Sequence, residues 1–125
     1  MRPQAVKADL PSLDLPFPWA VKAENLVFIS GQGPLGIDGK VVDGDIRAQT
    51  QLTLENVKKV VVAAGSDLDH VVSLTVYLKD LADFAAMNEV YRRFFRNEPR
   101  PARATIQAGL LFGMKIEIQG IAVSP

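Results

Sequence analysis

One arginine near the C-terminus has the surroundings of an anion-binding group. Arg103 lies in residues 101–108, Pro-Ala-Arg-Ala-Thr-Ile-Gln-Ala, where small or apolar residues alternate with polar ones. Because side chains alternate between the two faces of a strand, Arg103 and Thr105 are expected on one face and the apolar residues on the other. An arginine fixed on a strand offers a rigid fork of donors to a carboxylate or a phosphate. The segment predicts either an anion site or a surface salt bridge, the alternative open to any arginine.

A second alternating segment, residues 115–122, supplies groups for proton transfer. Glu117 and Gln119 share one face of this predicted strand, and isoleucines occupy the other. A carboxylate can take and release a proton, whereas an amide can only orient water through hydrogen bonds. If the two strands are neighbours in a sheet, they align Arg103 and Thr105 with Glu117 and Gln119. Together they predict one polar face that binds an anion and positions water.

Length and charge limit the classes of protein. The chain has 125 residues, enough for one domain with a single core, and we assign residues 1–125 to it. Fourteen basic residues balance fourteen acidic ones. This balance argues against nucleic acid or an anionic membrane as a partner, since such proteins usually carry a basic excess. Residues 1–15 lack a continuous apolar run, and no apolar run approaches the ~20 residues of a membrane span. We therefore expect a cytoplasmic protein.

The sequence offers no clear set of residues for a metal or an organic cofactor. It contains no cysteine and one histidine, His70, which argues against a catalytic zinc site. Gly31 and Gly33 are not followed by the Gly-Lys-Ser/Thr of a phosphate loop, so nucleotide binding is not expected. We therefore assign the chemistry to protein side chains alone.

Hydrophobic periodicity and turn signals predict an α+β fold. Residues 1–18 are expected to be irregular because their prolines hinder strand pairing. Asp45 can cap a helix that ends at Gly65. The predicted elements are strands 19–23 and 26–30, a hairpin turn over 37–41, helix 45–64, strand 71–78, helix 83–95, and strands 102–108 and 115–122. Two helices cover only one face of such a mixed sheet. The other face, part polar and part apolar, is expected to pack against other subunits and to leave clefts.

The order and spacing of several segments resemble the RidA/YjgF family of enamine/imine deaminases over residues 19–123. The matching segments are 26–34, 49–65, 76–80, 83–95, 101–103 and 115–118. The resemblance implies a chorismate-mutase-like fold and a homotrimer with active sites in the clefts between subunits. It also implies hydrolysis of 2-aminoacrylate and related enamines, released by pyridoxal-phosphate enzymes, to 2-keto acids and ammonia.

The same resemblance assigns roles to individual residues. Arg103 would clamp the substrate carboxylate, and Gln119 would take the place of the family's acid–base glutamate. The positions implied for substrate binding are Trp19, Ser30, Gly31, Asn88 and Thr105. Three positions depart from the family pattern, because Trp19 follows Phe-Pro where Tyr commonly follows Gly-Pro, the final glutamate is Gln119, and the loop's Leu-Pro is Leu-Phe at 111–112.

These departures leave several alternatives open. The chain is an enamine/imine deaminase, a pathway-specific deaminase of an unsaturated amino acid, or a non-catalytic carboxylate-binding or regulatory trimer. Arg103 predicts a small 2-imino or 2-keto acid as ligand in each case, whereas Gln119 weakens only the enzyme. Glu117 either replaces the missing carboxylate or forms a structural ion pair. Trp19 is either a wall of the cleft or part of the core. Ribonuclease activity, attributed to some members, is not expected at zero net charge.

Overall fold

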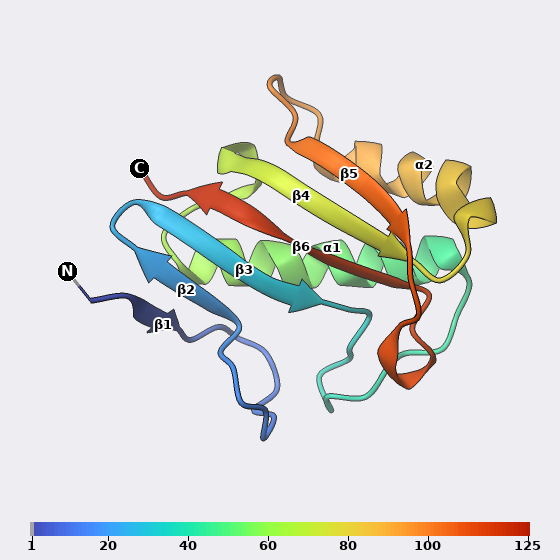
Figure 1. Ribbon diagram of the computed structural model, residues 1–125, viewed down its shortest axis with the longest axis horizontal. Helices are drawn as coiled ribbons and strands as arrows, with labels where there is room; N and C mark the ends of the chain where they lie inside the picture. Colours follow the sequence, from blue (N-terminus) through green and yellow to red (C-terminus); the bar gives the residue numbers. More distant parts are fainter. Residues whose placement is uncertain (1) are drawn as a thin grey trace.

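A computed structural model describes residues 2–125, which are organised around one six-stranded sheet (Figure 1). The strands lie in the order β1-β2-β3-β6-β4-β5. Their bounds are β1 Gln4–Val6, β2 Ala20–Ala23, β3 Leu26–Gln32, β4 Val71–Leu78, β5 Ala102–Gln107 and β6 Ile116–Val123. Neighbouring strands are antiparallel except for β4 and β5, which are parallel. The sheet is therefore mixed, as predicted.

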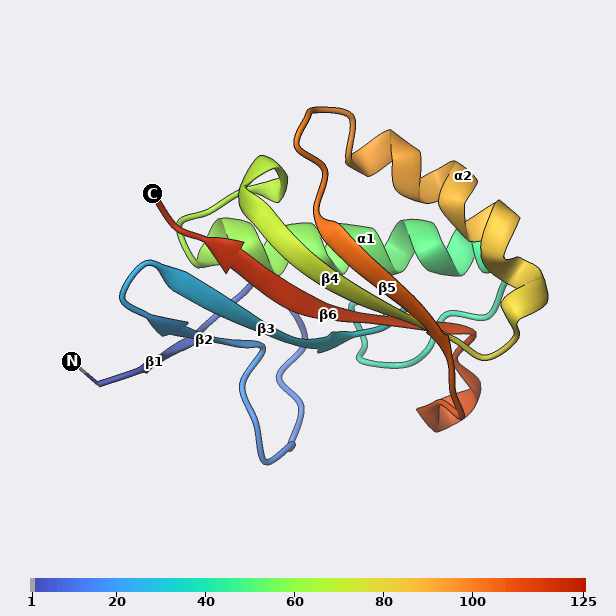
Figure 2. The same cartoon turned by 45° about the horizontal axis from the view of Figure 1, so that its top comes forward.

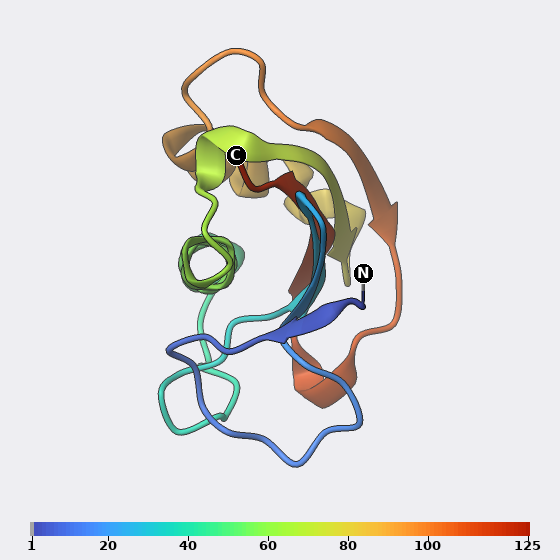
Figure 3. The same ribbon diagram turned by 90° about the vertical axis from the view of Figure 1, so that its left-hand side faces the viewer.

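Two helices, α1 (Ile46–Ala63) and α2 (Phe84–Phe94), pack on one face of the sheet (Figure 3). The Asp45 carboxylate caps α1 by accepting a hydrogen bond from the Ala48 N–H at 2.9 Å. Gly65 follows the end of α1 with a φ of +83°, which glycine adopts without strain. Short 3₁₀ helices complete the fold: η1 Leu68–His70, η2 Leu81–Asp83 and η3 Leu111–Gly113. The expected two-helix layer on a mixed sheet is confirmed. Within residues 2–125, neither helix is long and apolar enough to cross a bilayer.

The two C-terminal strands are not neighbours, which corrects the sequence-based prediction. β4 lies between β5 and β6, and β6 pairs antiparallel with both β3 and β4. α2 carries the chain from β4 to β5 (Figure 2), the kind of crossover that parallel strands require. Alternation within a segment predicts a strand but not its partner, because pairing depends on contacts distant in sequence.

Arg103 and Thr105 lie on the helix-covered face of the sheet, whereas Glu117 and Gln119 lie on the uncovered face. Arg103 is in register with Leu74, which is 1% exposed beneath the helices, and strand partners share a face. The small and apolar residues of β5 are on the uncovered face instead: Ala102, Ala104 and Ile106. The prediction that all four polar residues share one face is therefore wrong. β5 is an edge strand, so its helix-side residues meet the margin of α2 and not the central core.

Part of the N-terminal segment forms a strand, contrary to the expectation that residues 1–18 are irregular. β1 pairs with β2, with Ala5 opposite Val21, and Val6 is buried in the core. Three residues are too few for a recognisable alternation, and this strand depends on β2 for its hydrogen bonds. The remaining residues of 2–18 have no regular secondary structure, as expected.

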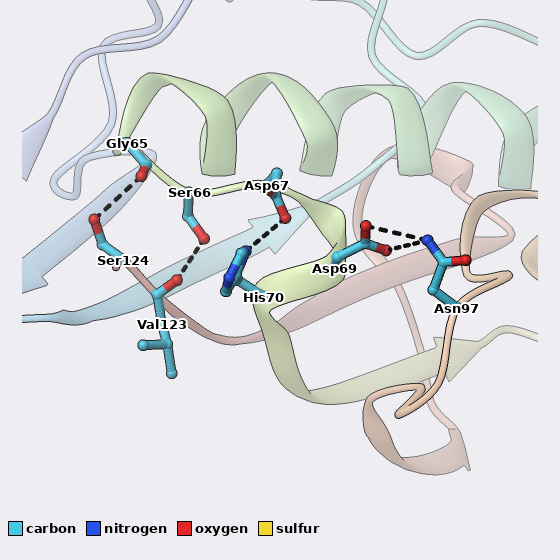
Figure 4. A network of polar contacts seen from close by, with 8 residues as sticks. All are labelled: Gly65, Ser66, Asp67, Asp69, His70, Asn97, Val123 and Ser124. Carbon is cyan, nitrogen blue, oxygen red and sulfur yellow. Dashed lines mark hydrogen bonds and ion pairs between the residues drawn. The ribbon is translucent and has the colours of Figure 1, made fainter.

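Side-chain hydrogen bonds connect the C-terminal end of α1 to the end of β6 (Figure 4). The Ser66 hydroxyl donates to the Val123 carbonyl at 2.6 Å, and the Ser124 hydroxyl donates to the Gly65 carbonyl at 3.3 Å. These bonds satisfy groups that helix and strand ends leave without partners. They hold α1 against the sheet at one end of the molecule.

The loop that follows α2 is connected to η1 in the same network (Figure 4). The Asn97 amide donates to the Asp69 carboxylate at 3.1 Å, and His70 Nδ1 lies 2.8 Å from the Asp67 carboxylate. His70 is thus part of a surface turn, as its sequence context predicts. The contact through Asn97 orders the loop that leads to Arg100 and β5.

Gly120 generates a stability prediction, because β6 passes close to β4 at this residue. A methyl group there would overlap the Ser73 carbonyl oxygen and lie 2.6 Å from Leu74 Cδ2. Since backbone would have to move, we expect Gly120→Ala to lower the free energy of unfolding by about 2 kcal/mol or more. Gly109→Ala is the matched control, because a methyl group at Gly109 meets no atom within 4 Å. Equal urea midpoints for the two variants would contradict the prediction.

Candidate functional site

Arg103 is held against three side chains of α2. Its guanidinium carbon lies 4.6 Å from the centre of the Tyr91 ring and 5.7 Å from that of Phe84. Its Nη1 is 4.0 Å from the sulfur of Met87. An arginine over aromatic faces is stabilised by cation–π attraction, which uses none of its N–H groups.

The donors of Arg103 are not used by any protein oxygen within residues 2–125, where Met87 sulfur is its one hydrogen-bond partner. Arg47 differs, since it is paired with Glu89 at 2.5 Å. Arg100 also differs, because it donates to the Phe95 carbonyl at 2.8 Å and to Glu98 at 3.1 Å. A salt bridge, the alternative role for Arg103, is thus not found in the described chain. Its half-buried guanidinium retains its N–H groups for a ligand.

An open pocket of about 260 Å³ surrounds this arginine. Its lining residues are Asn88, Tyr91, Arg92, Arg100, Pro101 and Arg103. The pocket combines three guanidinium groups with one amide and no carboxylate, so its charge favours an anion. The structure thereby brings Asn88 and Arg103 together, and Thr105 follows Arg103 on the same face of β5. Arg92 is exposed to solvent at the margin of this pocket.

The second group of predicted residues lies around the C-terminal half of β3. The Ser30 hydroxyl donates to the Pro18 carbonyl at 2.7 Å, and the Ser30 N–H donates to the Trp19 carbonyl at 3.0 Å. These bonds hold Trp19, the residue before β2, next to Ser30. The Trp19 side chain packs against the hydrophobic core and also lines an open pocket beside Phe17 and Pro18, so its role as a wall of the cleft stays a prediction.

Glu117 approaches this group from β6. A methyl group at Gly31 would lie 2.5 Å from Glu117 Oε2, so the carboxylate lies directly beside Gly31 and would have to move if this position carried a side chain. Glu117 has no ion pair within residues 2–125, so the predicted structural ion pair is not found in this part of the chain. Burial raises the pKa of its carboxyl above the ordinary value. A carboxyl with a raised pKa takes and releases a proton closer to neutral pH than an ordinary one, which makes Glu117 a candidate for proton transfer.

Gln119 is exposed on the same face of β6 and stands opposite Thr75 of β4. Its catalytic role remains a prediction. Of the two polar side chains on this strand face, Glu117 is nearer to Gly31 and is the one that can transfer a proton.

The predicted residues thus form two clusters on opposite faces of the sheet. The arginine pocket contains Asn88, Arg103 and the margin of α2, and the carboxyl cluster contains Ser30, Gly31 and Glu117. One copy of the chain does not bring them around one ligand. Tyr91 was not among the predicted site residues; its position three residues after Asn88 and on the same helix face is the signal that could have placed it in the pocket.

Three or more metal-binding side chains do not come together anywhere in residues 2–125. The side chains of both clusters are suited to binding and proton transfer without such a group. Burial raises the pKa of the Tyr91 phenol, an effect that the positive charge of Arg103 opposes.

The chain is similar in sequence and structure to known proteins. The family model described as endoribonuclease L-PSP matches residues 10–124. A RutC family protein of Pyrococcus horikoshii is 47% identical over 109 residues, 86% of each chain. Reactive Intermediate Deaminase A, chloroplastic, of Arabidopsis thaliana is 44% identical over 109 residues, 86% of this chain and 58% of that protein. The crystal structure of Escherichia coli TdcF with bound serine has a TM-score of 0.89 and 36% identity, covering 98% of this chain and 99% of that one.

The raised pKa of Glu117 predicts a pH-dependent effect on stability. The folded chain holds a proton on this carboxyl more tightly than the unfolded chain, in which the pKa is about 4.3. The stability contributed by this group is therefore complete below about pH 4 and is lost as the pH rises through the raised folded pKa. We expect Glu117→Gln to raise the urea midpoint at about pH 7 and to change it little near pH 4.

Glu89→Gln is the control, because its effect on the urea midpoint at neutral pH should be opposite to that of Glu117→Gln. Arg47 lowers the pKa of Glu89, so this group stabilises the fold at neutral pH, and the effect is lost as the pH falls through the lowered pKa. Glu89→Gln should lower the urea midpoint at neutral pH. A Glu117→Gln midpoint at or below that of the wild type at neutral pH would contradict the role of desolvation.

Proposed function

This chain belongs to the endoribonuclease L-PSP family, the RidA/YjgF family of the resemblance, and on that premise we propose that it is a reactive-intermediate deaminase. It hydrolyses 2-aminoacrylate-type enamines and imines to 2-keto acids and ammonia, in the cytoplasm and without a metal or organic cofactor. The observation that carries the proposal is the half-buried Arg103, whose donors no protein oxygen uses. A relative named as a reactive intermediate deaminase supports the reaction class.

Arg103 binds the substrate carboxylate in this proposal. Its planar fork can donate two parallel hydrogen bonds to the two carboxylate oxygens. Arg100 and Arg92 add positive charge to the pocket, and the Asn88 amide can donate a further bond. A ligand held this way presents its C2 atom and nitrogen away from the guanidinium.

Glu117 transfers the protons. The protonated Glu117 carboxyl donates a proton to C3 of 2-aminoacrylate, which gives the iminium form of 2-iminopropionate, and water then adds to C2 as the carboxylate takes one of its protons. The carboxyl returns this proton to the nitrogen, and the hydroxyl on C2 gives its remaining proton to the carboxylate as the C–N bond breaks, so that pyruvate and ammonia form and the carboxyl is protonated again. A pKa raised by burial suits a group that both donates and accepts. Gln119 lies on the same strand face, and we assign it to orienting the water; Ser30 and Gly31 border the same space.

Two copies of the chain complete each active site in the proposed homotrimer. The arginine pocket of one copy would meet the uncovered sheet face of the next, because the two clusters lie on opposite faces of one sheet. The uncovered face carries large apolar side chains at its surface, among them Leu26, Phe28 and Ile106. Apolar surface of this kind favours burial against another subunit.

A carboxylate-binding trimer without catalysis is the second candidate. The observation that favours it is Gln119, an amide in place of the family's glutamate. TdcF, a solved relative, holds serine, a small carboxylate ligand. Measured deamination separates the two candidates, because both require Arg103 and only the enzyme requires Glu117.

Kinetics with 2-aminoacrylate, generated in place by a dehydratase, test the assigned roles. We expect Arg103→Ala to lower kcat/KM by about 10- to 100-fold through lost charge-assisted hydrogen bonds. Glu117→Gln should lower kcat by about 10²- to 10⁴-fold, the usual contribution of general acid–base catalysis. Ammonia or keto-acid release is the measurement.

Gln119→Glu is the matched control on the same strand face, and its rate should stay within about threefold of wild type because Glu117 already transfers the proton. A marked increase with Gln119→Glu, together with no loss in Glu117→Gln, would exchange the two roles. No acceleration by the wild-type chain would favour the carboxylate-binding trimer.

Mixing two inactive variants tests the shared site. Arg103→Ala and Glu117→Gln chains, unfolded together and refolded at equal amounts, should regain about a quarter of the wild-type rate. In a closed ring, each site takes its arginine from one copy and its carboxylate from the next, so about one site in four is intact. Each variant refolded alone should remain inactive. No regained rate in mixed trimers, verified by mass spectrometry, would place the complete site within one copy.

A further inference from the structure

We propose that Tyr91 is a positioning residue that holds the Arg103 guanidinium in the orientation required to bind the substrate carboxylate. The inference rests on the proposed function and adds a second function to a residue of the α2 core. Tyr91 does not itself bind the carboxylate in this proposal; it acts through Arg103.

The Tyr91 ring is placed on α2 so that its face lies against the Arg103 guanidinium. Tyr91 and Phe84 are seven residues apart on α2, with Met87 between them, so the three lie on one face of the helix. Tyr91 is the closer ring, at 4.6 Å against 5.7 Å for Phe84. Tyr91 is also the more fixed, since it is 6% exposed and Phe84 is 45% exposed. A guanidinium over an aromatic face keeps its in-plane N–H groups free, which are the groups that fork a carboxylate.

The Tyr91 ring is itself held in place by packing against a second aromatic ring. Its ring lies 4.7 Å from that of Phe95, which is buried, with an angle of 36° between the planes. The carbonyl of Phe95 accepts the hydrogen bond from Arg100. The buried Phe95 ring thus supports the Tyr91 ring that faces Arg103, while the backbone of the same residue binds Arg100, a second guanidinium group of the pocket.

The phenol hydroxyl of Tyr91 is buried and makes no hydrogen bond of good geometry within residues 2–125, although the Arg103 side chain lies close enough to act on the pKa of the phenol. A buried tyrosine usually satisfies its hydroxyl, so a hydroxyl bond to this part of the chain does not explain the residue. The ring face is what contacts Arg103. The proposal thus predicts that phenylalanine replaces Tyr91 and that an aliphatic side chain does not.

The reason that positioning matters is the freedom of the arginine side chain. A free arginine loses many rotamers when it binds a ligand, whereas a stacked one has already lost them. Removal of the ring should therefore weaken carboxylate binding while the charge and the fork remain present.

The experiment compares Tyr91→Leu, Tyr91→Phe and Arg103→Ala with wild type, with pyruvate as the probe in calorimetric titration and 2-aminoacrylate in kinetics. Tyr91→Leu should raise the Kd for pyruvate and the KM by about 3- to 30-fold, the range of a cation–π contact, and change kcat little. Tyr91→Phe should stay within about twofold of wild type for both. The Arg103 Nε–Hε resonance should shift in Tyr91→Leu, because the ring that shields it is gone.

Phe94→Leu controls for loss of packing, since Phe94 is a partly buried aromatic residue on the same helix that packs on the core. A purely structural role for Tyr91 would leave the Kd of the folded Tyr91→Leu protein at the wild-type or Phe94→Leu value, and this result overturns the inference. An increase in Tyr91→Phe equal to that in Tyr91→Leu also overturns it. If Arg103→Ala binds pyruvate as wild type does, the proposed function itself has failed; if only Arg103→Ala binds poorly, the proposed function stands and the role of Tyr91 does not.

Discussion

The position of β6 between β3 and β4 determines the arrangement of the site. β6 pairs antiparallel with both neighbours, and its register places Glu117 opposite Tyr77 on the uncovered face. β5 is thereby left at the edge of the sheet, parallel to β4, with Arg103 beside Leu74 on the helix side. A single pairing pattern therefore separates the guanidinium from the carboxylate by the thickness of the sheet. Because of this separation, a site that uses both groups has to draw them from two copies of the chain, which is the arrangement proposed above.

Within residues 2–125, both charged groups lack a partner of opposite charge. Arg103 contacts aromatic rings and a sulfur atom, and Glu117 is desolvated beside a glycine. A partly buried charge without a partner costs stability. The buried hydroxyls of Thr50, Thr53 and Tyr91 also lack a partner in this part of the chain, whereas hydrogen bonds connect α1 to the end of β6.

Much of the fold could be predicted from local patterns. Asp45 and Gly65 marked both ends of α1, and the β-branched run at 71–78 matched β4. The partner of each strand could not be predicted, because alternation is the same whether β5 pairs with β4 or with β6. β1 was missed for a related reason, since three residues gain their structure from β2 alone.

For the site, the sequence could predict which residues have suitable chemistry but not how the strands place them. The sequence identified Arg103, Asn88 and Glu117 as residues with suitable chemistry, and the first two do line one pocket. It wrongly placed Arg103 and Glu117 on one face of the sheet, because the correct placement requires knowledge of the strand order. It also could not identify Tyr91 as the partner of Arg103, because an aromatic residue on an apolar stripe is typical of any core helix.

The glycine at position 31 has a consequence for how such a site can change over time. A methyl group at this position would meet the end of the Glu117 side chain, a flexible group that can turn away while the backbone stays in place. The fold would therefore tolerate a side chain gained at position 31, but the carboxyl would move. A single change on β3 can thus alter the placement of the carboxyl while Glu117 itself and the arginine pocket are unchanged.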